Sequence, residues 1–106
     1  MEVVHYLTPS GVDLLQTWLD TLDDRMTRAC ILRRIDRLRH GSFGDCRFCA
    51  AAVWELRIDY GPGYRVYYAR QGESRIVLLC GGSKRTQARD IAKAIACWKN
   101  VARRQR

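Results

Sequence analysis

Residues 54–90 constrain the fold of this chain most, because they contain three strand patterns separated by short turns. Residues 54–59 alternate apolar and polar side chains, and residues 64–68 do so again after the turn Gly61-Pro62-Gly63. Such alternation is typical of strands with one buried face. Residues 75–80 follow another turn and are almost continuously apolar, as expected of an interior strand that is covered on both faces. The pattern predicts a small antiparallel sheet.

The first turn predicts the pairing of the two alternating strands. With a three-residue loop at 61–63, the numbers of paired residues sum to 124, so that Leu56 faces Tyr68 and Asp59 faces Arg65. This register pairs apolar with apolar and polar with polar residues. It also puts Arg57 on the same face as Arg65. A cross-strand ion pair between Asp59 and Arg65 is the purely structural alternative to a functional role.

Two helical patterns precede these strands. Apolar residues recur at helical intervals over about residues 10–22, where Ser10 and Asp13 have the spacing of a capping box. A second helix is expected from about Arg25 to the stop at Gly41, with an apolar stripe among its arginines. That stripe consists of Ile31, Ile35 and Leu38. The short corner between the helices predicts an αα-hairpin.

The remaining segments complete the predicted order. Residues 3–6 form a short first strand, residues 41–52 read as a loop, and a basic final helix begins at about Thr86. Its expected apolar side consists of Ala88, Ile91, Ile95, Trp98 and Ala102. The sequence therefore predicts one α+β domain over residues 1–106, ordered β-α-α-β-β-β-α, with an antiparallel sheet packed on the αα-hairpin.

The charge of the chain is unevenly distributed. The net charge is +8, but residues 1–24 contain five acidic residues and no Lys or Arg, so residues 25–106 carry +13. This asymmetry favours a polyanionic partner, most often nucleic acid. A membrane surface is disfavoured because no amphipathic helix combines basic residues with a broad aromatic face. No long apolar run or export signal is visible, so we expect a cytoplasmic protein.

The cysteines and histidines do not predict a cofactor or a metal. The five cysteines include Cys46 and Cys49 at CxxC spacing, but no second CxxC and no nearby histidine completes a zinc site. His5 and His40 lie far apart in the pattern, which disfavours a two-histidine ribonuclease. The glycines before Lys84 lack the spacing of a phosphate-binding P-loop, so ATP chemistry is not expected.

The arginines of the sheet are the best candidates for chemistry. Arg57 and Arg65 share a face beside Tyr67, and Lys84 and Arg85 follow the third strand. Guanidinium groups bind phosphate and stabilise the additional charge of a pentacoordinate phosphorane. Such a cluster could cleave RNA by orienting the 2′-hydroxyl for attack on its own phosphate. In the structural alternative, Arg57 simply stacks on Tyr67.

Two blocks of the sequence resemble a known family. ELRIDYGPGYRVYY, residues 55–68, and IVLLCGGSKRTQARDIAKA, residues 76–94, resemble the RelE/ParE superfamily of type II toxins. The resemblance is to the addiction-module killer branch, which is phage Gp49-like or HigB-like, and it extends upstream to the loop at 41–45. It implies a small α+β toxin that a helix-turn-helix antitoxin neutralises in a hetero-oligomeric complex. Many relatives enter the ribosome and cut mRNA there.

The resemblance also implies roles for individual residues. It points to a catalytic set of Arg57, Arg65 and Lys84, and to an RNA-binding set of Tyr67, Arg85 and Arg89. No metal or cofactor is implied.

The chain departs from RelE-type relatives in two ways. Val53 and Glu55 occupy places where those relatives have lysines, and about Ile91 the chain lacks their tyrosine. Glu55 or Lys84 is then the candidate general base. These departures keep two alternatives open, a ParE-like inhibitor of DNA gyrase and a nucleic-acid-binding module without catalytic activity.

Overall fold

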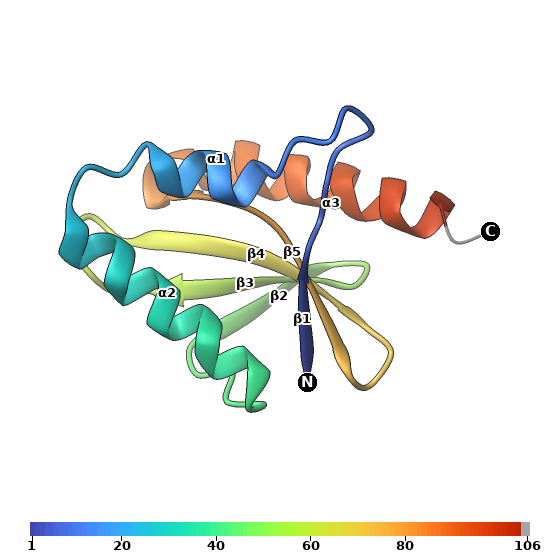
Figure 1. Ribbon diagram of the computed structural model, residues 1–106, viewed down its shortest axis with the longest axis horizontal. Coiled ribbons are helices and arrows are strands. Elements are labelled where there is room, and N and C mark those ends of the chain that lie inside the picture. The colour runs from blue at the N-terminus through green and yellow to red at the C-terminus, as the bar shows by residue number, and fades with distance from the viewer. Residues whose placement is uncertain (105–106) are drawn as a thin grey trace.

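The computed structural model describes residues 1–104 and shows a mixed sheet between two layers of helices (Figure 1). The elements in chain order are β1 (Glu2–His5), α1 (Leu14–Asp20), α2 (Arg25–Arg39), β2 (Cys46–Ala50), β3 (Val53–Ile58), β4 (Tyr64–Gln71), β5 (Arg75–Ser83), the 3-10 turn η1 (Lys84–Thr86) and α3 (Gln87–Arg104). The α+β class is confirmed. The order differs from the prediction by one additional strand, β2.

The five strands form one sheet in the order β1-β5-β4-β3-β2. Pairing is antiparallel from β2 to β5, as the turns predict, but β1 pairs with β5 in parallel. The sheet is therefore mixed rather than antiparallel throughout. The strands from β2 to β5 alternate in direction, so β2 runs antiparallel to β1 and begins at the end of the sheet where β1 ends.

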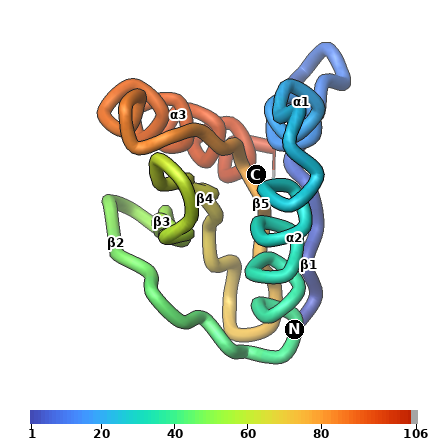
Figure 2. The backbone as a smooth tube through the Cα atoms, turned by 90° about the vertical axis from the view of Figure 1, so that its left-hand side faces the viewer, coloured from blue at the N-terminus to red at the C-terminus, as the bar shows by residue number. Residues whose placement is uncertain are grey.

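Each face of the sheet buries a separate hydrophobic core. Leu15 and Leu19 of α1 and the predicted stripe of α2 pack on one face, against residues such as Leu56 and Ile58. Ala94 and Cys97 of α3 pack on the other face, which includes Val53, Tyr67 and Leu79 among its buried residues. Figure 2 shows α1 and α2 on the opposite side of the sheet from α3.

The helix boundaries follow their capping residues. Asp13, not Ser10, caps α1 by accepting a hydrogen bond from the backbone of Gln16, so α1 is shorter than the predicted 10–22. Asp24 caps α2, and Gly41, the predicted stop, has a φ of 73° just after its end. α1 packs mainly on β5, whereas α2 lies against β1 and β3, so the pair covers one face jointly.

The register of the central hairpin differs from the prediction by two residues. Leu56 pairs with Val66 and Arg57 with Arg65, so the paired numbers sum to 122 rather than 124. The last pair is Ile58 with Tyr64, and residues 59–63 form a longer loop in which the Gly63 amide donates to the carbonyl of Tyr60 at 3.0 Å. A shift of two leaves every side chain on its predicted face.

The segment predicted as the loop 41–52 contains β2, an edge strand. β2 pairs with β3, so that Arg47 lies opposite Glu55, and a bulge interrupts the pairing between Phe48 and Ala50. Cys46 lies opposite Leu56 of the first core, whereas Cys49 packs on the second core. The two cysteines therefore point to opposite faces of the sheet, and the CxxC spacing cannot hold one metal ion.

Gly81 and Gly82 do not end β5, as the sequence suggests, but lie within it. A Cβ atom on Gly81 would be 2.4 Å from the ring of Trp18, and one on Gly82 would be 1.9 Å from the carboxylate of Asp90. Glycine is therefore required by the close approach of α1 and α3 to the strand.

The buried face of α3 is rotated relative to the prediction. Its buried residues are Asp90, Ala94 and Cys97, whereas Ala88 and Ala102 are exposed. Among the helices of the described chain, none combines the length and the apolar character that a membrane crossing requires.

Candidate phosphate-binding site

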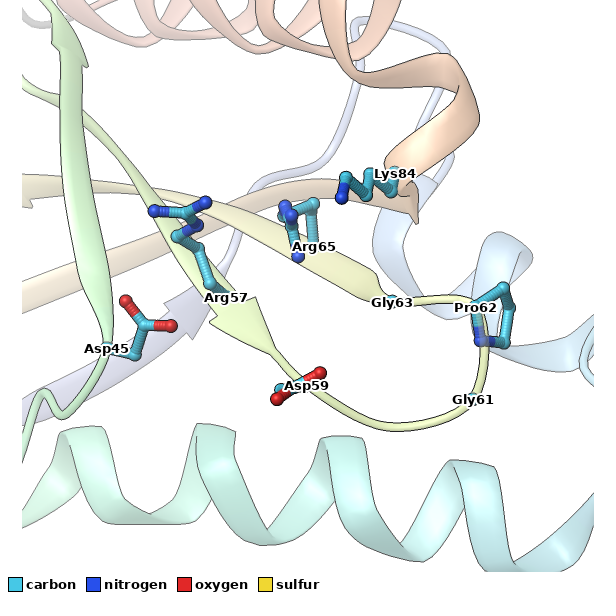
Figure 3. A pocket seen from close by; sticks show the side chains of 8 residues that line it. All are labelled: Asp45, Arg57, Asp59, Gly61, Pro62, Gly63, Arg65 and Lys84. Atoms are coloured by element: carbon cyan, nitrogen blue, oxygen red, sulfur yellow. The ribbon is translucent and has the colours of Figure 1, made fainter.

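A polar cavity of about 380 Å³ opens where β3, β4 and the start of η1 meet (Figure 3). Its walls are formed by two arginines and a lysine, by two aspartates, and by the turn between β3 and β4. These residues are Asp45, Arg57, Asp59, Gly61, Pro62, Gly63, Arg65 and Lys84. All three residues of the predicted catalytic set, Arg57, Arg65 and Lys84, thus line one cavity.

Arg57 and Arg65 are direct cross-strand partners on β3 and β4. The side chain of Arg57 is 38% exposed, whereas that of Arg65 is only 6% exposed. Arg65 is therefore almost completely buried, because β4 is the central strand and the start of α3 covers this end of it. The alternative ion pair of Arg65 with Asp59, which lies in the loop after β3, does not form. The ionic partner of Arg65 is Glu55.

Glu55 is fully buried behind the two arginines. Its Oε1 atom lies 3.8 Å from the Nε atoms of both Arg57 and Arg65. Its Oε2 atom accepts hydrogen bonds from the hydroxyl of Tyr67 at 3.0 Å and from Nε2 of Gln87 at 2.9 Å. A carboxylate in this environment is stabilised by the neighbouring cations. Because it has no solvent exposure, Glu55 cannot reach a substrate hydroxyl, which removes it as a general base.

Tyr67 is not positioned to contact RNA. Its side chain is fully buried and its hydroxyl is bonded to Glu55. Burial, together with the adjacent charge of Glu55, raises the pKa of Tyr67 above its ordinary value, so the hydroxyl remains protonated and donates. The RNA-binding role that the resemblance implies for Tyr67 conflicts with this burial, because the ring has no free face.

Lys84 reaches the cavity because its backbone is bonded to the turn between β3 and β4. The Lys84 amide donates to the carbonyl of Gly63 at 3.0 Å, and a Cβ on Gly63 would lie 3.6 Å from that of Lys84. Gly63 has a φ of 90°, a conformation that suits glycine. The contact places the exposed Lys84 side chain next to Arg65 at the mouth of the cavity (Figure 3).

The other two residues predicted to bind RNA lie outside the cavity. Arg85 is exposed on η1, one residue beyond Lys84. Arg89 is 78% exposed and lines a neighbouring groove of about 360 Å³ between α1 and α3, in which Trp18 and Lys93 also lie. They extend a basic surface away from the cavity without contributing to its lining.

Several residues of the site were not identified from the sequence. Asp45 and Asp59 line the cavity, and Arg34 of α2 holds its edge by donating to the backbone carbonyls of Arg57, at 2.8 Å, and of Asp45, at 3.3 Å. Asp45 could have been identified from its place in the 41–45 loop of the resemblance. Arg34 gives no such signal, because it is one of six arginines on a helix.

Metal ligation is not supported by the arrangement of potential ligands. Within residues 1–104, no three His, Cys, Asp or Glu side chains gather as metal ligands would. Nδ1 of His5 lies 2.8 Å from Oδ2 of Asp13. His40 is far from this pair in the sequence.

Fold and cavity together define a small α+β protein with a cavity lined by two arginines and a lysine at one end of its sheet. The family model described as "Phage derived protein Gp49-like (DUF891)" matches residues 17–99, a segment that runs from α1 into α3 and contains the entire cavity. An uncharacterized protein of Haemophilus influenzae is 46% identical over 78 residues, which are 74% of this chain and 79% of that protein.

The chain belongs to the phage-derived Gp49-like family. This family is RelE/HigB-like and is associated with the toxins of toxin–antitoxin systems, as the resemblance of the two blocks implies.

Proposed function

We propose that this protein is the toxin of a type II toxin–antitoxin pair and that it inhibits translation by cutting mRNA in the ribosome. The observation that supports this proposal best is the convergence of Arg57, Arg65 and Lys84 on one open cavity. Three cationic side chains, from β3, β4 and η1, form a site that suits a phosphodiester. The association of the Gp49-like family with toxins makes RNA within a ribonucleoprotein a reasonable target.

The proposed reaction uses position and charge rather than a cofactor. Arg57 and Lys84, the accessible cations, bind the scissile phosphate. Arg65, which is largely buried in the lining of the cavity, adds its positive charge. The neighbouring 2′-hydroxyl attacks the phosphorus in line, a 2′,3′-cyclic phosphate forms, and the 5′-oxygen leaves. The cations stabilise the charge of the phosphorane. With Glu55 enclosed, the groups able to take the 2′-hydroxyl proton are the carboxylates Asp45 and Asp59, and the Lys84 ammonium can give a proton to the leaving 5′-oxygen; all three line the cavity.

The test is to induce the protein in a bacterial host and map transcript 5′ ends. We expect growth arrest and new 5′ ends within translated regions, both lost in Arg57→Ala and Lys84→Ala. Arg33→Ala is the matched control, because Arg33 is exposed on α2 away from the cavity. A DNA damage response with intact mRNA would indicate a gyrase inhibitor instead. Salt-sensitive nucleic-acid binding without cleavage or arrest would indicate a binding module.

The family association also supports a cognate antitoxin as partner. We propose a small helix-turn-helix protein, whose acidic or amphipathic segment covers the basic surface of the toxin. The apolar stripe of α2 is buried in the core and is therefore not available for docking. The available surfaces are the outer side of α2, where Met26 and Leu32 are 65% and 51% exposed, the exposed side of α3, and the cavity.

Hydrogen exchange of the toxin–antitoxin complex tests this partner. We expect protection of α2, α3 or the residues around the cavity when the antitoxin binds. Protection confined to residues 10–22 would refute the proposed mode of binding.

A further inference from the structure

The two carboxylate oxygens of Glu55 differ in their hydrogen bonding, because one accepts two hydrogen bonds and the other accepts none. Oε2 accepts hydrogen bonds from Tyr67 and Gln87. Oε1 is buried without a hydrogen-bond partner and lies 3.8 Å from Nε of Arg57 and from Nε of Arg65. One oxygen thus fixes the carboxylate in the fold, and the other faces the two arginines.

The contact between Oε1 and the arginines is ionic without being a hydrogen bond. A separation of 3.8 Å is too long for an N–H···O bond, and Nε of Arg65 is also buried without a partner. Buried polar atoms are nearly always bonded, so unpaired atoms on both sides of one contact call for an explanation. Nη1 of Arg65 already donates to the carbonyl of Tyr64 at 3.1 Å. A charge that attracts both guanidinium groups without bonding to either leaves their other terminal N–H groups available to another acceptor.

We propose that Glu55 is a positioning residue that holds the Nε edges of Arg57 and Arg65, so that their terminal nitrogens face the cavity. Tyr67 and Gln87 keep the carboxylate in place, from β4 and from the first residue of α3 respectively. Without Glu55, the two adjacent guanidinium groups would repel each other and Lys84. The positioning role of Glu55 is inferred from geometry alone, whereas its effect on catalysis rests on the proposed function.

Loss of Glu55 should separate phosphate binding from catalysis. Glu55→Gln removes a negative charge next to two arginines, so a polyanion should bind as tightly as to the wild type or more tightly. The same change releases the arginines from their fixed geometry, so the rate of cleavage should fall by about 100-fold. A residue that merely supports the fold would instead weaken both properties together.

The direct measurement is hydrogen exchange at Nε of Arg65, followed by NMR on ¹⁵N-labelled protein without substrate. We expect exchange to be faster by roughly tenfold or more in Glu55→Gln, and faster by a smaller factor in Tyr67→Phe and Gln87→Ala. Tyr68→Phe is the matched control, because the Tyr68 hydroxyl is buried without a partner and its side chain packs on the opposite face of the sheet. Its exchange rate should equal that of the wild type.

The second measurement is binding of a short RNA with a 2′-O-methyl group at every position, which has no 2′-hydroxyl to attack the phosphate and therefore cannot be cleaved by the proposed reaction. Unchanged exchange at Arg65 Nε in a folded Glu55→Gln protein would overturn the proposal. If Glu55→Gln does not fold, the exchange rates of Tyr67→Phe and Gln87→Ala are compared with that of Tyr68→Phe. Equal exchange rates in these three variants would likewise overturn the proposal. Suppose that exchange is faster in the variants but the wild-type protein does not cleave RNA. That result would support the positioning role and contradict the proposed function.

Discussion

Arg34 on α2 donates a hydrogen bond of 2.8 Å to the backbone carbonyl of Arg57 on β3. The same guanidinium reaches the carbonyls of Phe43 and Asp45, at 3.4 and 3.3 Å, in the loop that leads into β2. The amide of Arg57 in turn donates to the carbonyl of Asp45 at 2.9 Å. Arg34 therefore joins the helical layer to the end of the strand that carries a cavity arginine, although it does not line the cavity.

Arg34→Ala should reduce both stability and toxicity. Removing the guanidinium leaves strand and loop carbonyls without their charged donor, which should lower the free energy of unfolding by about 1–3 kcal/mol. Urea denaturation measures the loss, and growth after induction measures toxicity. Arg33→Ala, on the exposed side of the same helix turn, should change stability by no more than about 0.5 kcal/mol. Equal behaviour of the two variants would contradict the role of Arg34.

The two cavity arginines should respond differently to replacement by alanine. Arg57→Ala removes a half-exposed side chain and should lower the cleavage rate by about 100-fold or more with little loss of stability. Arg65→Ala leaves the buried carboxylate of Glu55 with one fewer cation and should cost about 3–5 kcal/mol of stability as well. Cleavage assays and urea denaturation on both proteins test this difference. A fully stable but inactive Arg65→Ala protein would show that the pair with Glu55 contributes little to folding.

Alternation along the strands predicted the face of each cavity arginine, but not its neighbours. Side chains repeat every two residues, so a register that is wrong by two residues still places Arg57 and Arg65 on the same face. The contacts of Glu55 depend on the true register, in which it lies opposite Tyr67, and on the start of α3, which brings Gln87. These contacts require distances between elements that periodicity does not supply.

The strands at the two edges of the sheet were the least predictable. β2 has the sequence CRFCA, without β-branched residues, and follows a glycine-rich segment, so its local propensity resembles that of a loop. Pairing with β3 makes it a strand. The parallel pairing of β1 with β5 joins residues that are more than 70 positions apart, and no turn in the sequence indicates it.

Substitution of either glycine in β5 should destabilise the protein. The Cβ of Gly82→Ala would overlap the carboxylate of Asp90, which a hydrogen bond from Thr86 holds in place, and that of Gly81→Ala would overlap Trp18. Overpacking of this kind costs about 1–3 kcal/mol. Thermal or urea unfolding measures the effect, and Ser83→Ala on the same strand is the control. Wild-type stability for both glycine variants would mean that α1 and α3 approach the strand less closely.

The cap of α2 should make stability depend on pH in the acid range. The hydrogen bond from the Thr27 hydroxyl lowers the pKa of Asp24 below its ordinary value of 3.8. A lowered folded-state pKa stabilises the protein above the unfolded-state value, and this contribution is lost as the pH falls through the folded-state pKa. The urea midpoint of the wild type should therefore fall more between pH 5 and pH 3 than that of Asp24→Asn. Asp23→Asn, at the neighbouring exposed position, should retain the wild-type dependence.

Asp59→Asn should strengthen binding of RNA by the isolated protein. Asp59 is exposed on the loop after β3 and lines the cavity with three cations, so its charge opposes an incoming phosphate. Its replacement should lower the Kd for a non-cleavable RNA fragment about two- to fivefold at low salt, with a smaller effect at high salt because exposed charges are screened. Titrations at two salt concentrations measure both effects.

Asp20→Asn is the control for this substitution, because Asp20 is an exposed carboxylate on α1 outside the cavity. Weaker binding by Asp59→Asn would mean that Asp59 organises the loop rather than opposing the phosphate. Stronger binding combined with loss of cleavage would assign the proton-accepting role to Asp59, since the amide retains the shape of the side chain but cannot take a proton. Stronger binding with full cleavage would leave Asp45 as the group that receives the 2′-hydroxyl proton.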